Sequence, residues 1–148
     1  MVRAEHRPDL SVDEFVDDTI KNNPSWLRQA FADKLLEEMG RLQTRYCSLE
    51  SVGDPEMVHY LRARFPGEFF SVYIEASLEK RLEHQMIRKD ITDIEEAGRI
   101  LVPKDQFKEN FWHMADIRGI ADVVVENSST LDEFKSKLGE LLQRHQIP

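Results

Sequence analysis

The chain has 148 residues, of which 41% are hydrophobic and 32% charged, and its formal net charge is −8. This length suits one domain with a sizeable core, and the excess of acidic residues disfavours broad binding to a nucleic-acid backbone. The chain contains no run of about eighteen apolar residues that could span a membrane, and its start, "MVRAEHRPDL", is not a secretory signal. We therefore expect a soluble, cytoplasmic protein with neither nucleic acid nor a membrane as partner.

The first forty residues predict two helices. Ser11 and Glu14 have the spacing of a capping box that opens the first helix, and Pro24 ends it. The second helix follows with Ser25 as its N-cap and Gly40 as its C-cap. Apolar residues recur at helical spacing in both, so each helix is expected to bury one face.

The next segment, "RYCSLESV" at residues 45–52, alternates in the manner of a short strand. It contains Cys47, the single cysteine of the chain, which excludes an internal disulfide and predicts a buried, unreactive thiol. A helix over residues 55–65 should follow, with Pro55 in its first turn.

The run "FFSVYIEAS" at residues 69–77 is almost continuously apolar, which is typical of a strand buried on both faces of a parallel sheet. The other expected elements are helices at 78–88, 94–101 and 103–120, a strand at 121–127 and a helix at 130–146. Strands that alternate with helices predict a three-layer α/β/α fold with a small, mostly parallel sheet. We expect a single domain over residues 1–148.

The residues that could carry chemistry are few. The five histidines have no metal-ligand spacing, so we expect no metal site. Arg81, His84 and Arg88 share one face of the helix that follows the first buried strand, where arginine can grip phosphate oxygens. Alternatively, Arg81 pairs with Glu79 or Glu83, and Arg88 only favours the C-terminal end of its helix.

The order of segments suggests a family. "FFSVYIEASLEKRLEHQMIR", then "KDQFKEN", then "IADVVVENSSTLDEFKSKLGELL" resembles the C-terminal half of the P-loop nucleoside and nucleotide kinases, especially the dephospho-coenzyme A kinase-like and deoxynucleoside monophosphate kinase-like proteins. "SVGDPEMVHYLRARF" is similar to the family's segment after its third strand. The resemblance covers about residues 45–146 and implies a lid-like segment at about 88–118.

The resemblance also implies phosphate-binding residues. Arg81 and Arg88 would contact donor phosphates, and Lys104 with Asp105 would stand at a basic-Asp step of the family. His84 occupies a position where the family often has arginine, and Lys104 one where arginine is usual. Each departure loses a fixed bidentate donor.

The main departure is the absence of GxxxxGK followed by Ser or Thr, the motif with which these kinases hold a nucleoside triphosphate. The family's first strand, which lies in the middle of its sheet, is missing as well. We therefore expect a P-loop-kinase-like domain without its first strand and P-loop. Three explanations stay open: another chain supplies the missing parts, the sheet has rearranged, or the chain is part of a longer one.

The expected function is that of a degenerate kinase-like subunit that binds a nucleotide, a phosphorylated small molecule or a protein partner, with another chain or a second copy completing it. One alternative is an active ATP-dependent phosphotransferase that uses magnesium and acts on a small acceptor such as a nucleoside monophosphate. Another is a helix-rich interaction module that docks a partner through an exposed "NFWHM" segment at residues 110–114.

Overall fold

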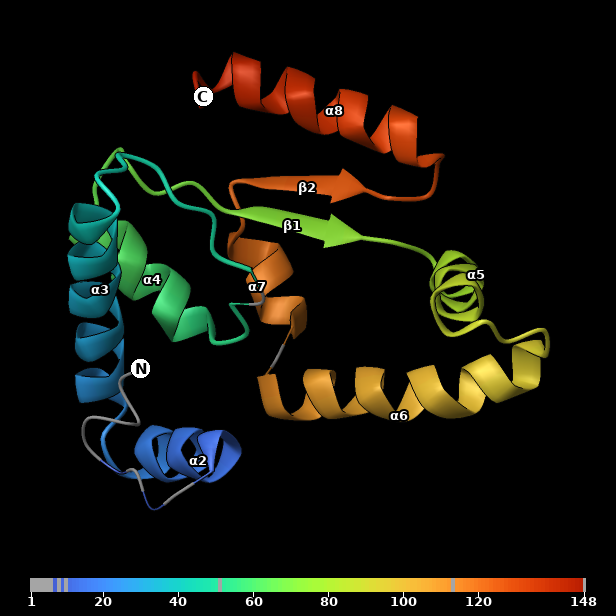
Figure 1. Cartoon of the computed structure of the whole chain (residues 1–148), viewed down its shortest axis with the longest axis horizontal. Coiled ribbons are helices and arrows are strands. Elements are labelled where there is room, and N and C mark those ends of the chain that lie inside the picture. Colours follow the sequence, from blue (N-terminus) through green and yellow to red (C-terminus); the bar gives the residue numbers. More distant parts are fainter. Residues whose placement is uncertain (1–6, 8, 10, 51, 113, 148) are drawn as a thin grey trace. The chain divides into compact units, whose positions relative to one another are not determined.

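The computed structural model describes residues 7, 9, 11–50, 52–112 and 114–147. Its elements are grouped in two compact units, Met1–Glu50 and Ser51–Pro148, and Figure 1 shows the helices and strands of each. The single domain expected from the length of the chain stays a prediction, because compactness alone does not test whether the units fold separately. No helix in the described part of the chain is long and apolar enough to cross a membrane.

The first unit contains two helices. These are α2 (Val12–Asn22) and α3 (Pro24–Arg41). The predicted capping box opens α2: the Ser11 hydroxyl accepts the Glu14 N–H at 3.2 Å, and the Ser11 N–H donates to the Glu14 carboxylate at 2.8 Å. Phe15 of α2 is buried, and its ring meets Trp26 of α3 edge to face with 6.4 Å between the ring centroids. This aromatic contact joins the two helices.

Both ends of α3 differ from the sequence expectation. Its N-cap is Asn23, whose side chain accepts a backbone N–H of the first turn at 3.3 Å. The predicted Ser25 cap is wrong because Pro24 needs no N–H partner and is itself well suited to the first helical position. At the other end the helix continues one residue past Gly40, which does not act as the predicted C-cap.

The strand predicted at residues 45–52 is absent from the described part of that segment. Residues 45–50 have no regular structure, and Tyr46 and Cys47 are exposed. The alternating pattern is not sufficient because a strand also needs a neighbour for its backbone hydrogen bonds. The expectation of a buried thiol at Cys47 is also wrong. Residues 45–50 form no strand that could pack into the core, and the side chain of Cys47 is exposed.

The second unit contains a parallel sheet of two strands. These are β1 (Val72–Glu75) and β2 (Val123–Glu126). The register pairs Val72 with Val123 at one end and Glu75 with Glu126 at the other. The prediction of a mixed α/β protein with a small parallel sheet is therefore confirmed, with both strands shorter than expected.

Most of the second unit is helical. Its helices are α4 (Pro55–Arg64), α5 (Leu78–Lys89), α6 (Ile94–Trp112), α7 (Met114–Ile120) and α8 (Leu131–Arg144). Figure 1 shows α8 on one side of the sheet and α7 on the other. Helix α6 runs through Pro103, where the sequence suggests a boundary between two helical stretches. The side chains of residues 111–113, on which the expectation of an exposed docking segment rests, lie outside the described part of the structure.

The sheet is covered only in part. Val125 of β2 is 8% exposed, and Leu141 of α8 is buried as well, so α8 covers β2. Ile74 is paired with Val125 in the register, and paired residues share a face of the sheet, yet Ile74 is 51% exposed. The prediction that the first strand is buried on both faces is wrong because no described element covers Ile74 as α8 covers Val125.

A hydrogen-bonded cluster joins α4 to the start of both strands. The carboxylate oxygen Oδ2 of Asp122 accepts from the Ser71 N–H at 2.8 Å, the Ser71 hydroxyl at 2.6 Å and Arg62 Nη2 at 3.0 Å. Burial by itself raises the pKa of Asp122, but the hydrogen bonds from Ser71 and Arg62 outweigh burial and hold that pKa below its usual value. The cluster therefore favours an ionised Asp122 and fixes the amino end of the sheet.

Candidate functional site

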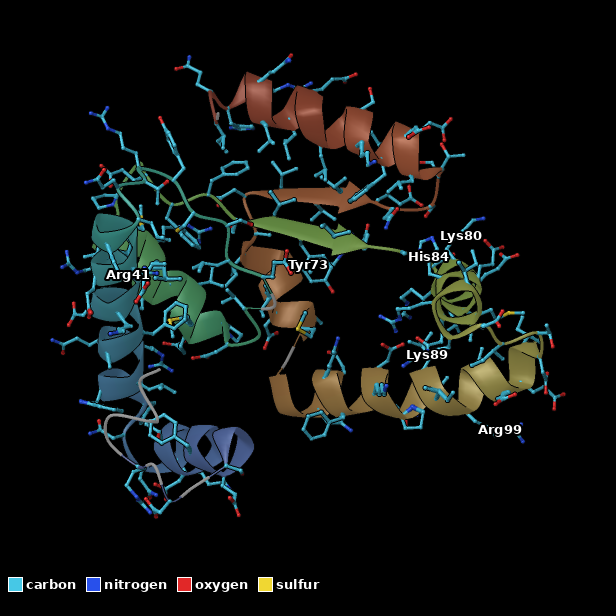
Figure 2. The ribbon with its side chains drawn as sticks, viewed as in Figure 1. Arg41, Tyr73, Lys80, His84, Lys89 and Arg99 are labelled. Carbon is cyan, nitrogen blue, oxygen red and sulfur yellow. The ribbon has the colours of Figure 1, made fainter. Side chains whose placement is uncertain are left out.

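Helix α5 begins directly after β1, at the carboxyl end of the sheet. Ser77 caps the helix by accepting a backbone N–H of the first turn at 3.3 Å. The carboxyl edge is the place where open α/β sheets bind ligands. Arg81, His84 and Arg88 follow at intervals of three and four residues. Figure 2 shows His84 on the side of α5 nearer the end of β1 and Lys89 on the side nearer α6.

Two of the predicted phosphate-binding residues come together as an ion pair. Arg81 Nη1 of α5 lies 2.5 Å from Asp105 Oδ2 of α6, and both side chains are partly exposed. The pair joins the two helices and neutralises the charge of Arg81. An anion that approaches Arg81 would therefore compete with Asp105, or bind to guanidinium N–H groups that Asp105 does not use.

Gln85 is a residue of this site that the sequence interpretation missed. It lies on α5 between the arginines and is 2% exposed, and its side-chain oxygen accepts from Arg88 Nη2. Its amide nitrogen Nε2 is buried and has no acceptor among the described residues, and the same holds for Nε of Arg81. We call Arg81, Gln85 and Arg88 the α5 donor cluster. The sequence signal for Gln85 is its position four residues after Arg81, which puts it on the same helix face as the arginine that pairs with Asp105 of α6.

His84 and Lys104 are the other two residues that the sequence predicts to bind phosphate. Both are exposed, and no hydrogen bond or ion pair in the described part of the chain joins them to the cluster. Lys104 borders a shallow hollow of about 350 Å³ on α6, which Pro103, Phe107 and Lys108 also line. Two separate bonded pairs therefore form, Arg81 with Asp105 and Gln85 with Arg88, and no bond in the described part of the chain adds His84 or Lys104 to either.

A second ion pair lies at the carboxyl end of β1. Arg118 Nε of α7 donates to the Glu75 carboxylate at 2.7 Å, which lowers the pKa of Glu75 and raises that of Arg118. This pair anchors α7 to the sheet. The sequence interpretation missed Arg118 because the partners are distant in sequence and no motif links them.

A divalent metal has no prepared site among the described residues. No group of three His, Cys, Asp or Glu side chains comes together there, and the carboxylates of Asp105 and Glu75 each face an arginine. Magnesium usually keeps several waters and is held by one or two carboxylates together with the phosphates of a substrate.

The outer edges of the sheet are a second candidate binding feature. The carbonyl groups of Ser71 and Glu75 accept N–H groups of Val123 and Asn127, so these residues direct their backbone groups inward. Backbone groups alternate in direction from one residue of a strand to the next. The N–H and C=O groups of Val72 and Ile74 of β1 therefore point outward, away from β2. No further strand pairs with either edge in the described part of the chain.

Comparisons with known proteins give a limited result. No family model matches the chain, and no solved structure matches it. The chain is similar to two UPF0200 proteins. It is 34% identical over 90 residues to a UPF0200 protein of Methanoregula boonei, a match that covers 61% of this chain and 47% of that protein. It is 31% identical over 88 residues to a UPF0200/UPF0201 protein of Archaeoglobus fulgidus, covering 57% and 26% of the two chains.

These comparisons correct the family suggested by the sequence. The relatives are UPF0200 proteins, so the recognition of the chain as a member of the P-loop nucleoside and nucleotide kinases is wrong. The order of strand, helix, strand and helix did not discriminate because many α/β proteins share it. The chain spans about half or less of the length of each relative, and neither name states an activity.

Proposed function

We propose that this chain is a protein-binding module whose sheet is completed by strands of another polypeptide. The observation that supports the proposal is the two-stranded parallel sheet with both edges unpaired in the described chain. Parallel sheets normally have more strands and are covered on both faces. A sheet of this size therefore gains stability when a further strand pairs with it.

Exposed apolar side chains on the strands support the same proposal. Ile74 is 51% exposed and Val124 is 36% exposed, one on each face of the sheet. Burying an apolar side chain of this size contributes about 1.5–3 kcal/mol if it is fully removed from water. A partner that adds a strand and its covering helix would bury these side chains and pair the open edge together.

Hydrogen exchange on the purified full chain tests this proposal. We expect the outward N–H groups of Val72 and Ile74 to exchange rapidly in the isolated chain, because no acceptor protects them. Addition of a binding partner should slow their exchange. Light scattering over a range of concentrations measures whether the chain associates with itself.

The substitution Ile74→Lys should abolish association, because it places a charge on the open face of the sheet while the isolated chain tolerates it at a half-exposed position. Ile87→Lys is the matched control, since Ile87 is 81% exposed on α5. A strict monomer whose Val72 and Ile74 N–H groups are protected as strongly as the core would rule out the proposal.

We propose binding of a phosphate-bearing ligand at the α5 donor cluster as a second function. Its support is the pair of buried donors, Arg81 Nε and Gln85 Nε2, that have no acceptor among the described residues. Buried donors are almost always satisfied in folded proteins, by protein, water or a bound anion. Gln85 is bonded to the guanidinium of Arg88, and this neighbouring positive charge favours an anion over a neutral acceptor at its free donor.

Calorimetry with inorganic pyrophosphate at fixed salt tests the second function. Arg88→Gln removes one charge and should weaken binding about tenfold or more, because a hydrogen bond to a charged group contributes about 1.5–3 kcal/mol. Arg99→Gln is the control, since Arg99 is exposed on α6 and its nearest carboxylate, that of Asp93, is 4.0 Å away. Equal weakening by both variants would mean that pyrophosphate responds only to general charge, and the cluster would not be a site.

A further inference from the structure

Gln85 is a polar residue at a position where an apolar residue would serve packing. Its side chain is 2% exposed on α5, and its amide nitrogen Nε2 has no acceptor among the described residues. Burial of an amide donor without an acceptor lowers the stability of a fold. Methionine is similar in length and would fill the same space without this loss. Packing by itself therefore does not explain a glutamine here.

The oxygen of the same side chain holds Arg88. Gln85 Oε1 accepts a hydrogen bond from Arg88 Nη2, and the two residues are three apart on α5. Arg88 is exposed, and an exposed arginine samples many rotamers that a ligand has to restrict when it binds. Gln85 is enclosed by its neighbours, so its oxygen is a fixed point that directs the guanidinium of Arg88.

The two arginines of the α5 donor cluster differ in how their charge is compensated. Arg81 lies 2.5 Å from the carboxylate of Asp105. Arg88 is held by the neutral amide of Gln85 and forms no ion pair in the described part of the chain. A neutral acceptor orients a guanidinium and leaves its positive charge available to an anion. Arg88 therefore combines a directed side chain with an uncompensated charge.

We infer that Gln85 is a positioning residue that directs Arg88 toward a phosphate-bearing ligand. The inference rests on the second proposed function and adds to it the side chain that prepares the site. In this role Gln85 acts through Arg88, by reducing the conformational entropy that Arg88 loses when the ligand binds. The enclosed nitrogen of Gln85 follows from the same role, because an amide that supplies a fixed oxygen brings its N–H donors into the same enclosed position.

The substitution Gln85→Met tests the inference, because it conserves volume and removes both the amide oxygen and the amide donor. In urea unfolding of the full chain, its midpoint should equal or exceed that of the parent chain. In calorimetry with inorganic pyrophosphate, its affinity should fall about threefold to tenfold. Gln143→Met, at an exposed position on α8, is the matched control and should change neither quantity. A purely structural role of Gln85 would not lower affinity while stability is retained.

Two further measurements test whether the effect passes through Arg88. In the Arg88→Gln background, Gln85→Met should change pyrophosphate affinity by less than about twofold, because the arginine that Gln85 directs is gone. NMR relaxation of the Arg88 Nε–H group, measured without ligand, should show larger motions in Gln85→Met than in the parent chain. Equal motion of Arg88 in the two chains would overturn the inference.

The outcomes separate the inference from the function on which it rests. Unchanged pyrophosphate affinity in Gln85→Met, with binding that still depends on Arg88, would overturn the inference and leave the phosphate-binding function intact. Equal weakening by Gln85→Met in the parent and Arg88→Gln chains would also overturn the inference. A parent chain that does not bind pyrophosphate would refute the function and the inference together.

Discussion

Asp122 makes hydrogen bonds to two distant parts of the second unit. Its carboxylate holds Ser71 and Arg62, which are 51 and 60 residues away in sequence. Asp122→Asn removes the charge from these bonds and should lower the free energy of unfolding by about 1–2 kcal/mol at pH 7. We expect a loss in the lower half of this range, because the side chain of Asp122 is one third exposed and solvent screens the ion pair.

Urea unfolding measures this loss. Asp116→Asn on α7 is the matched control, since Asp116 is exposed and surface substitutions usually change stability by less than about 0.5 kcal/mol. Equal losses in the two variants would show that the cluster contributes nothing specific to Asp122.

The lowered pKa of Asp122 also predicts how stability depends on pH. A carboxyl group whose pKa is lower in the folded state contributes stability above its unfolded pKa, about 3.9, and loses it as the pH falls through the folded pKa. The difference in unfolding free energy between the parent chain and Asp122→Asn should therefore be largest near neutral pH and should shrink below about pH 4. A difference that is constant from pH 7 to pH 3 would contradict the assignment.

The start of α8 depends on two side chains that form a capping box. The Thr130 hydroxyl accepts the Glu133 N–H at 3.3 Å, and the Glu133 carboxylate accepts the Thr130 N–H at 3.0 Å. Thr130→Ala should lower the free energy of unfolding by about 1 kcal/mol. Ser136→Ala, at an exposed position inside the same helix, should leave it unchanged or raise it slightly. Thermal unfolding of both variants tests the difference, and a smaller loss for Thr130→Ala than for Ser136→Ala would refute it.

The division of the chain into two compact units predicts where a protease cuts. Arg45 is exposed in the irregular segment between α3 and α4, whereas Arg99 is exposed within α6. Trypsin should therefore cut after Arg45 well before it cuts after Arg99, because cleavage requires an extended backbone. Mass spectrometry of early digests identifies the cut. Arg45→Gln should remove it, and an early cut after Arg99 would contradict the structure of α6.

Local signals in the sequence predict the elements of this chain well where they act within one turn or one strand. The capping box at Ser11, the helix that starts at Pro55 and the strands within 69–77 and 121–127 are all present. These features depend on neighbouring residues, so the sequence contains what is needed. The failure at residues 45–52 follows the same logic, because a strand requires a partner that local alternation cannot supply.

The candidate site could be predicted only in part. The shared helix face of Arg81 and Arg88 follows from their spacing, but the partners Asp105 and Gln85 depend on how α5 packs against α6. Gln85 is buried, and its amide nitrogen has no acceptor among the described residues. Ile74 is apolar, yet its side chain is exposed on the sheet. Burial is a property of the assembled elements. It is determined by contacts between segments far apart in the chain, and only the folded structure could decide it.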